Sequence, residues 1–214
     1  MKRILILIFV LYVCGAAGRA QDLKTLFVAL PDSLSPLLTE VNRADFGDFL
    51  ESGMKAEVKN LLGEASVMDT LAQDFVQIRL SSASTLQMKK LPMEQGDSVL
   101  CVVKTFAGPE KESELHLFTQ DWKALDASRL FDGKSIGELA GSLVQKPDTM
   151  SESRFEELKA MIEPRMVSAL LLQHENAVVV RLSLPLLSTE DKKLVNAIKL
   201  QRKFNWSGKS FKES

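Results

Sequence analysis

The chain has 214 residues, with 27 Lys and Arg against 28 Asp and Glu, and its net charge is −1 at neutral pH. A charge so close to balance argues against nucleic acid or an anionic membrane surface as an obligatory partner. With 45% hydrophobic residues, a chain of this length can bury one good core or two smaller ones.

The first twenty residues have the pattern of a secretory signal peptide. Two basic residues precede an apolar stretch over 4–13, and small residues follow up to Ala20. We expect cleavage after Ala20, which leaves a periplasmic or secreted protein with no stable transmembrane anchor. The alternative is a lipoprotein acylated at Cys14, but Val13 stands where such signals need a small residue. Cleavage leaves Cys101 as the one cysteine, so no intrachain disulfide is expected. Its apolar neighbours in the sequence predict that it lies in the core.

The N-terminal part of the mature chain is predicted to be mainly helical. Residues 23–30 form a short apolar strand or an ordered arm. Asn42 is placed to cap a helix whose apolar residues recur at i, i+3 and i+4 from Phe46, and the same spacing predicts more helix over 54–63.

The central part of the chain alternates or clusters apolar residues at strand spacing. Short polar turns separate these segments, which is typical of an antiparallel meander. The continuous apolar run in the third segment indicates a strand that is covered on both faces. The predicted strands are 65–71, 75–80, 98–106 and 114–118.

After residue 125 the pattern loosens, and a second helix-and-strand region follows. Ser153 and Glu156 form a capping box for a helix, and residues 165–172 and 177–184 are predicted as strands. Ser188 can cap a short helix before the last strands, which pass through residue 204 and end near residue 211.

The two regions resemble each other. Residues 76–81 match residues 178–183 at an offset of 102, and a tryptophan lies near the end of each region. We therefore predict an α+β fold with an antiparallel sheet and helices packed on one face, possibly as two similar tandem halves. The expected boundaries are residues 21–125, a connecting segment at 126–150, and residues 151–214.

Three short stretches carry a resemblance to a known family. They are Lys24 to Leu34, Asn42 to Phe46, and Trp206 to Phe211. In these stretches the chain resembles a Bacteroidales family of small secreted proteins of unknown function, whose domain covers the mature chain. The resemblance implies an exported protein of the bacterial envelope and names no catalytic residue.

The residues needed for the common catalytic sites are scarce. The mature chain has two histidines, His116 and His174, and no serine has the sequence of a nucleophile elbow. We expect no metal and no cofactor. Neighbouring acids could still serve a carboxylate-based hydrolase of an envelope polymer, and we keep that as the alternative function. These acid pairs are Asp45 with Asp48, Glu156 with Glu157, and Glu190 with Asp191.

The candidate ligand or partner contacts are two tryptophans and a basic cluster near the C-terminus. The tryptophans could form a platform if they converge, and packing at a sheet edge is the structural alternative. The cluster is either a solvated face or a patch for an anionic partner. The residues are Trp122, Trp206, Lys199, Arg202, Lys203 and Lys209.

Four Asp, Ser or Thr, apolar triplets look like O-glycosylation sites of Bacteroidales envelope proteins. Ser98 and Thr149 lie in predicted turns and are the best candidates, followed by Ser33 and Thr70. Ser33 has a helix cap as its structural alternative.

The hypothesis that fits these observations is a non-catalytic binding or structural module of the bacterial envelope. Its partner would be an envelope protein or peptide, held by a sheet face or edge.

Overall fold

The structure is a computed structural model, and it describes residues 21–162 and 165–214. The predicted signal peptide and Cys14 lie outside the described residues. None of the helices formed by the described residues combines the length and the apolar character that crossing a bilayer requires.

A seven-stranded antiparallel sheet forms the larger half of the molecule. Its strands follow one another in space in the same order as in the sequence, so each pairs with its neighbours along the chain. The strands are β1 (Glu57–Lys59), β2 (Ala65–Leu71), β3 (Phe75–Ser81), β4 (Ser84–Pro92), β5 (Ser98–Ala107), β6 (Lys111–Phe118) and β7 (Ala124–Leu125).

A four-stranded antiparallel sheet forms the second half, in the order β11-β10-β9-β8. Its strands are β8 (Met166–Leu171), β9 (Ala177–Ser183), β10 (Gln201–Trp206) and β11 (Phe211–Glu213). The helices are α2 (Leu23–Val28), α3 (Glu40–Glu51), the 3-10 helix η1 (Gly137–Leu139), α4 (Ala140–Leu143), α5 (Glu152–Ala160) and α6 (Thr189–Val195).

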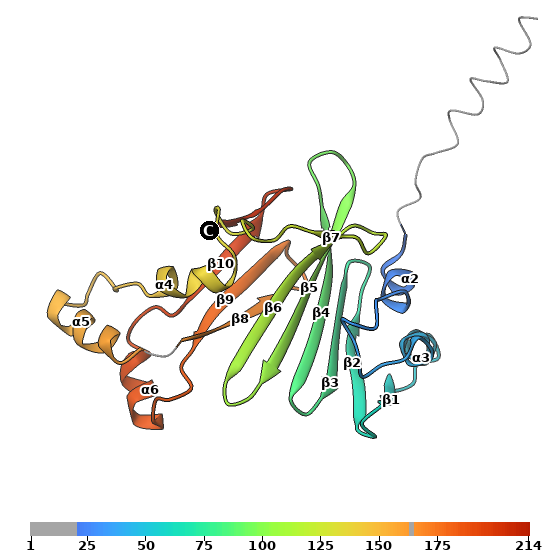
Figure 1. The fold of residues 1–214 in the computed structure, drawn as a ribbon, viewed down its shortest axis with the longest axis horizontal. Coiled ribbons are helices and arrows are strands. Elements are labelled where there is room, and N and C mark those ends of the chain that lie inside the picture. Colours follow the sequence, from blue (N-terminus) through green and yellow to red (C-terminus); the bar gives the residue numbers. More distant parts are fainter. Residues whose placement is uncertain (1–20, 163–164) are drawn as a thin grey trace, which may run out of the picture.

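Two hydrophobic cores cover the two faces of the large sheet. On one face, α2 and α3 pack against β2–β5, and Figure 1 shows both helices beside the first strands of the sheet. On the other face, the small sheet and residues of η1, α4, α5 and α6 complete a larger core. Since β5 contributes side chains to both cores, its uninterrupted apolar run is explained.

The predicted α+β class is confirmed, and most predicted strands are present. Three N-terminal predictions are wrong. Residues 23–28 form α2, capped by Asp22. The cap of α3 is Thr39, and Asn42 is the third residue of that helix, where it completes the capping box. The helix expected over 54–63 is replaced by turns and the short strand β1.

Two more details differ from the prediction in the rest of the chain. Strand β4 was not predicted, because Gln87 and Lys89 make it look partly exposed although both are buried. The cap of α5 is Ser151 rather than Ser153. The segment over 126–150 carries η1 and α4, and its residues join the core that the two sheets share.

The two segments that suggested a duplication have matching environments. Both β3 and β9 are strands, and buried, intermediate and exposed positions follow the same order along their seven residues. The similarity between these two segments therefore extends from sequence to burial, while the two sheets differ in strand number.

Cys101 lies fully buried in β5, and this burial raises the pKa of its thiol far above the usual range. Because the thiolate is the reactive form, we expect the folded mature protein to resist iodoacetamide at about pH 8. In urea the same protein should take up one label, as measured by intact mass. Rapid labelling without denaturant would contradict the buried position.

Candidate functional site

Strand β8 is an edge strand of the small sheet and lies across the large sheet. Side chains of the large sheet bond to backbone groups on the free edge of β8. Gln87 receives the Leu171 N–H at 2.8 Å on Oε1 and donates from Nε2 to the Leu171 carbonyl at 3.3 Å. Ser113 Oγ accepts the Ala169 N–H at 2.9 Å. Lys89 Nζ donates to the Gln173 carbonyl at 2.9 Å, so buried polar side chains fix how the two sheets meet.

The face of the large sheet that meets β8 changes character along its strands. At one end its side chains are apolar and belong to the core that the small sheet covers. Toward the other end the same face carries Gln77, Thr85, Gln87, Thr105 and Ser113, and strand pairing places Thr85 opposite Thr105 and Thr105 opposite Ser113. A polar wall therefore continues beyond the region where the sheets are packed together.

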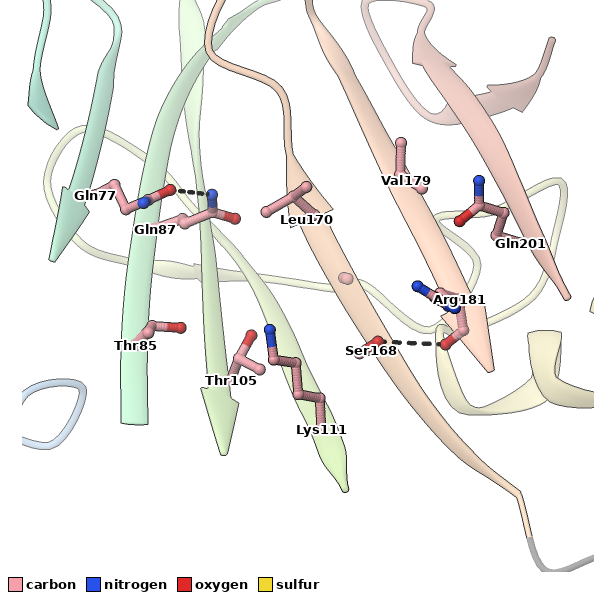
Figure 2. A pocket seen from close by; sticks show the side chains of 11 residues that line it. Gln77, Thr85, Gln87, Thr105, Lys111, Ser168, Leu170, Val179, Arg181 and Gln201 are labelled. Atoms are coloured by element: carbon pink, nitrogen blue, oxygen red, sulfur yellow. Dashed lines mark hydrogen bonds between the residues drawn. The ribbon is translucent and has the colours of Figure 1, made fainter. Parts of the chain in front are cut away.

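The outer face of the small sheet forms the opposite wall of a hollow of about 330 Å³. Figure 2 shows Gln77, Thr85, Thr105 and Lys111 on one side, with side chains of β8, β9 and β10 on the other. We call this hollow, together with the two hollows that adjoin it around Arg181, the inter-sheet groove. The residues that line it include Gln77, Thr85, Thr105, Glu110, Lys111, Ser168, Leu170, Val179, Arg181, Lys192, Lys199 and Gln201.

The inter-sheet groove is positively charged, although the whole chain carries a net charge of −1. Its cationic side chains are Lys111, Arg181, Lys192 and Lys199, and its acidic side chain is Glu110. Lys192 forms an ion pair with Glu110. Among the described residues the other three cations, Lys111, Arg181 and Lys199, have no carboxylate partner, and they attract an anion.

Hydrogen-bond donors in the groove are left without protein partners. Within residues 21–162 and 165–214, neither the ammonium of Lys111 nor the guanidinium of Arg181 has a hydrogen-bond or ion-pair partner. The amide oxygen of Gln77 accepts a 2.8 Å bond from Gln87 Nε2, which leaves the Gln77 NH₂ group available. In Figure 2 the Arg181 side chain extends from β9 toward the opposite wall. The groove therefore presents mainly donors, which suit a ligand rich in acceptor oxygens.

Lys199 is the one residue of the predicted basic cluster that lines the groove. Arg202 Nη1 bonds Glu213 at 2.6 Å, and Lys203 pairs with Glu175. Lys209 lies in the exposed turn before β11. Carboxylates 11 and 28 residues away in the sequence therefore neutralise part of the predicted cluster.

The two tryptophans pack against different cores. Trp122 packs against Phe118 with the two rings tilted and their centroids 5.5 Å apart, on the side of α2 and α3. Trp206 meets Phe211 at 5.1 Å in the core shared by the two sheets, and its Nε1 donates to the Pro92 carbonyl at 2.6 Å. The structure thus places each of them in a packing role.

The predicted acid pairs lie on helices, and none of these acids is among the residues that line the groove. Asp48 bonds Lys24 at 3.4 Å, and Glu156 and Glu157 pair with Lys159 and Arg154. Asp191 bonds the cap residue of α6. Among the described residues no three His, Cys, Asp or Glu side chains are grouped to hold a metal ion.

The predicted glycosylation residues have two kinds of environment. Thr149 and Ser33 are exposed in turns, and Ser33 is not the cap of a helix. Ser98 begins β5 and Thr70 lies within β2, and both are partly buried.

Arg181, Lys111 and Gln77 were not singled out from the sequence. Arg181 occupies the position in β9 that matches Arg79 in β3, at the offset of 102. Arg79 bonds Asp69 at 3.1 Å, whereas Arg181 has no such carboxylate in the described part of the chain. The signal that could have identified Arg181 is this difference between two matched arginines, of which only Arg79 has an acidic partner among the described residues.

Comparison with known proteins identifies a family and a fold. A family described as "Protein of unknown function (DUF3256)" matches residues 16–211. A solved domain of an uncharacterized protein from Porphyromonas gingivalis W83 is similar to this chain, with a TM-score of 0.69 and 22% sequence identity. The similarity covers 91% of this chain and 100% of that one, and at this identity it shows the fold alone. No curated protein matches the sequence.

Proposed function

Because the chain belongs to the DUF3256 family, whose description gives no function, we propose a function from its geometry: a non-catalytic ligand-binding module of the bacterial envelope. The inter-sheet groove is the binding site. The observation that supports this proposal is a set of donors that face one hollow and have no partner in the described part of the chain, namely Lys111, Arg181 and the Gln77 NH₂ group. Ligand sites are concave and combine a few polar groups with apolar contacts, here Leu170 and Val179.

The proposed location is the periplasm or the extracellular space. It is supported by the signal-peptide pattern of residues 1–20 and by the resemblance to an exported Bacteroidales family. A sugar on Thr149 or Ser33, if present, would lie on exposed turns and would leave the groove open.

The lining of the groove supports binding rather than carboxylate-based hydrolysis. A glycosidase needs two carboxylates on either side of the scissile bond. Glu110 is the acidic residue among the described lining residues, and it is paired with Lys192.

A variant that fills the groove tests the proposal. Leu170 is 51% exposed on β8 within the hollow, so tryptophan there would occupy the space of a ligand. We expect tagged mature protein to retain an envelope component from the native bacterium, and Leu170→Trp to lose it. Leu186→Trp should retain that component, because Leu186 is 75% exposed and lies outside the lining.

Intact mass on the same samples would check cleavage after Ala20 and the presence of any sugar. Equal retention by the wild type and Leu170→Trp would contradict binding in the groove. Cleavage of an envelope polymer by the wild type but not by Leu170→Trp would support the hydrolase instead.

A further inference from the structure

We propose that the inter-sheet groove binds an acidic peptide segment, with Arg181 and Lys111 as the anchors for its carboxylates. This inference rests on the proposed function and names the chemical class of the ligand. Its first support is charge complementarity, since Lys111, Arg181 and Lys199 are cations without a carboxylate partner among the described residues. A planar guanidinium such as that of Arg181 suits the two oxygens of a carboxylate.

The neutral side chains of the groove suit a peptide backbone. The Gln77 NH₂ group and the Gln201 amide can donate to peptide carbonyls, and the Thr85 hydroxyl can donate or accept. Figure 2 shows these groups on both walls, so a bound chain would meet them on either side. Leu170 and Val179 provide a small apolar contact between the polar groups.

Strand β8 is not the element to which this peptide would add. Gln87 already bonds the outward N–H and carbonyl of Leu171, and Ser113 accepts the outward Ala169 N–H. Recognition therefore depends on side chains and on charge rather than on extension of the small sheet.

The lining also argues for a peptide over an acidic glycan or a lipid. Among the described residues, no aromatic side chain lines the three hollows, and sugar rings commonly stack on such rings. An acyl chain needs an apolar channel, whereas eight of the eleven residues that line the first hollow are Gln, Thr, Ser, Lys or Arg.

Titration with two matched peptides tests the proposal. The probes are a labelled peptide of alternating serine and glutamate and the same peptide with glutamine at each glutamate, followed by fluorescence anisotropy. We expect the mature protein to bind the glutamate peptide at least about tenfold more tightly than the glutamine peptide. The affinity for the glutamate peptide should fall as the salt concentration is raised.

Charge-removing variants locate the contact. We expect Arg181→Gln and Lys111→Gln each to weaken binding of the glutamate peptide by about fivefold to tenfold. Arg79→Gln and Lys212→Gln are the matched controls, because both residues are paired with carboxylates outside the groove, and each should change the affinity by less than about twofold. All these residues are exposed, so the thermal midpoint should be unchanged.

The outcomes separate this inference from the proposed function. If both peptides bind equally and Leu170→Trp abolishes binding, the groove is a binding site but the preference for acid is wrong. If neither peptide binds and an oligogalacturonate binds in an Arg181-dependent way, the ligand is an acidic glycan and the peptide proposal is overturned. If no probe binds and Leu170→Trp leaves envelope capture unchanged, both proposals fail.

Discussion

Replacing Phe211 with alanine is expected to lower the free energy of unfolding by about 3–5 kcal/mol. Phe211 is fully buried, stacks on Phe131 with ring centroids 5.3 Å apart, and meets Trp206 edge-on. Its backbone N–H donates to the Leu130 carbonyl at 2.8 Å. The ring therefore joins the last strand to the segment between the two sheets, and its loss leaves a cavity there. Urea unfolding followed by tryptophan fluorescence measures the change.

Phe106 supplies the matched control for this substitution. Its side chain is 42% exposed near the end of β5, so Phe106→Ala should destabilise the protein much less than Phe211→Ala. Equal losses in the free energy of unfolding from the two substitutions would show that burial of Phe211 in the core is not the source of the effect.

Replacing Arg43 with methionine is expected to lower the free energy of unfolding by about 2–5 kcal/mol. Arg43 is 4% exposed, and its guanidinium donates to the Val28 carbonyl at 2.9 Å and the Leu38 carbonyl at 2.8 Å. It also bonds Asp32 at 2.9 Å. Methionine keeps much of the apolar stem but leaves two carbonyls without this donor, and each buried carbonyl without a partner is costly. Chemical denaturation monitored by circular dichroism gives the value.

Arg79→Met is the comparison for Arg43→Met. Arg79 is exposed and its ion pair with Asp69 is solvated, so we expect little change in the denaturation midpoint. If both variants lost the same stability, the buried hydrogen bonds of Arg43 would not be the cause.

The parts of the fold that could be predicted depend on contacts between neighbouring segments. β3, β5 and β6 were predicted because their alternating or continuous apolar patterns report burial directly. β4 was missed because Gln87 and Lys89 are buried and bonded to Leu171 and Gln173, each 84 residues further along the chain. No local pattern contains the partner of such a residue, so a buried glutamine looks like an exposed one.

The candidate site was predicted less well than the fold, for a related reason. Lys199 belonged to the predicted basic cluster and lines the groove, but Arg202 and Lys203 are paired with carboxylates brought close by folding. Arg181 is a candidate because it has no such partner within residues 21–162 and 165–214. The sequence does not show which cations fold beside an acid. The functional interest of a charge depends on its tertiary neighbours.

The attachment of β8 to the large sheet has a further consequence for self-association. An open strand edge is a template on which a second chain can pair and start an aggregate. On the outward edge of β8, Ser113 accepts the Ala169 N–H and Gln87 bonds both backbone groups of Leu171, and Lys89 bonds the Gln173 carbonyl just after the strand. Because these backbone groups are already bonded, fewer of them can pair with a strand of a second chain, which disfavours edge-to-edge polymerisation. The neighbouring groove stays open.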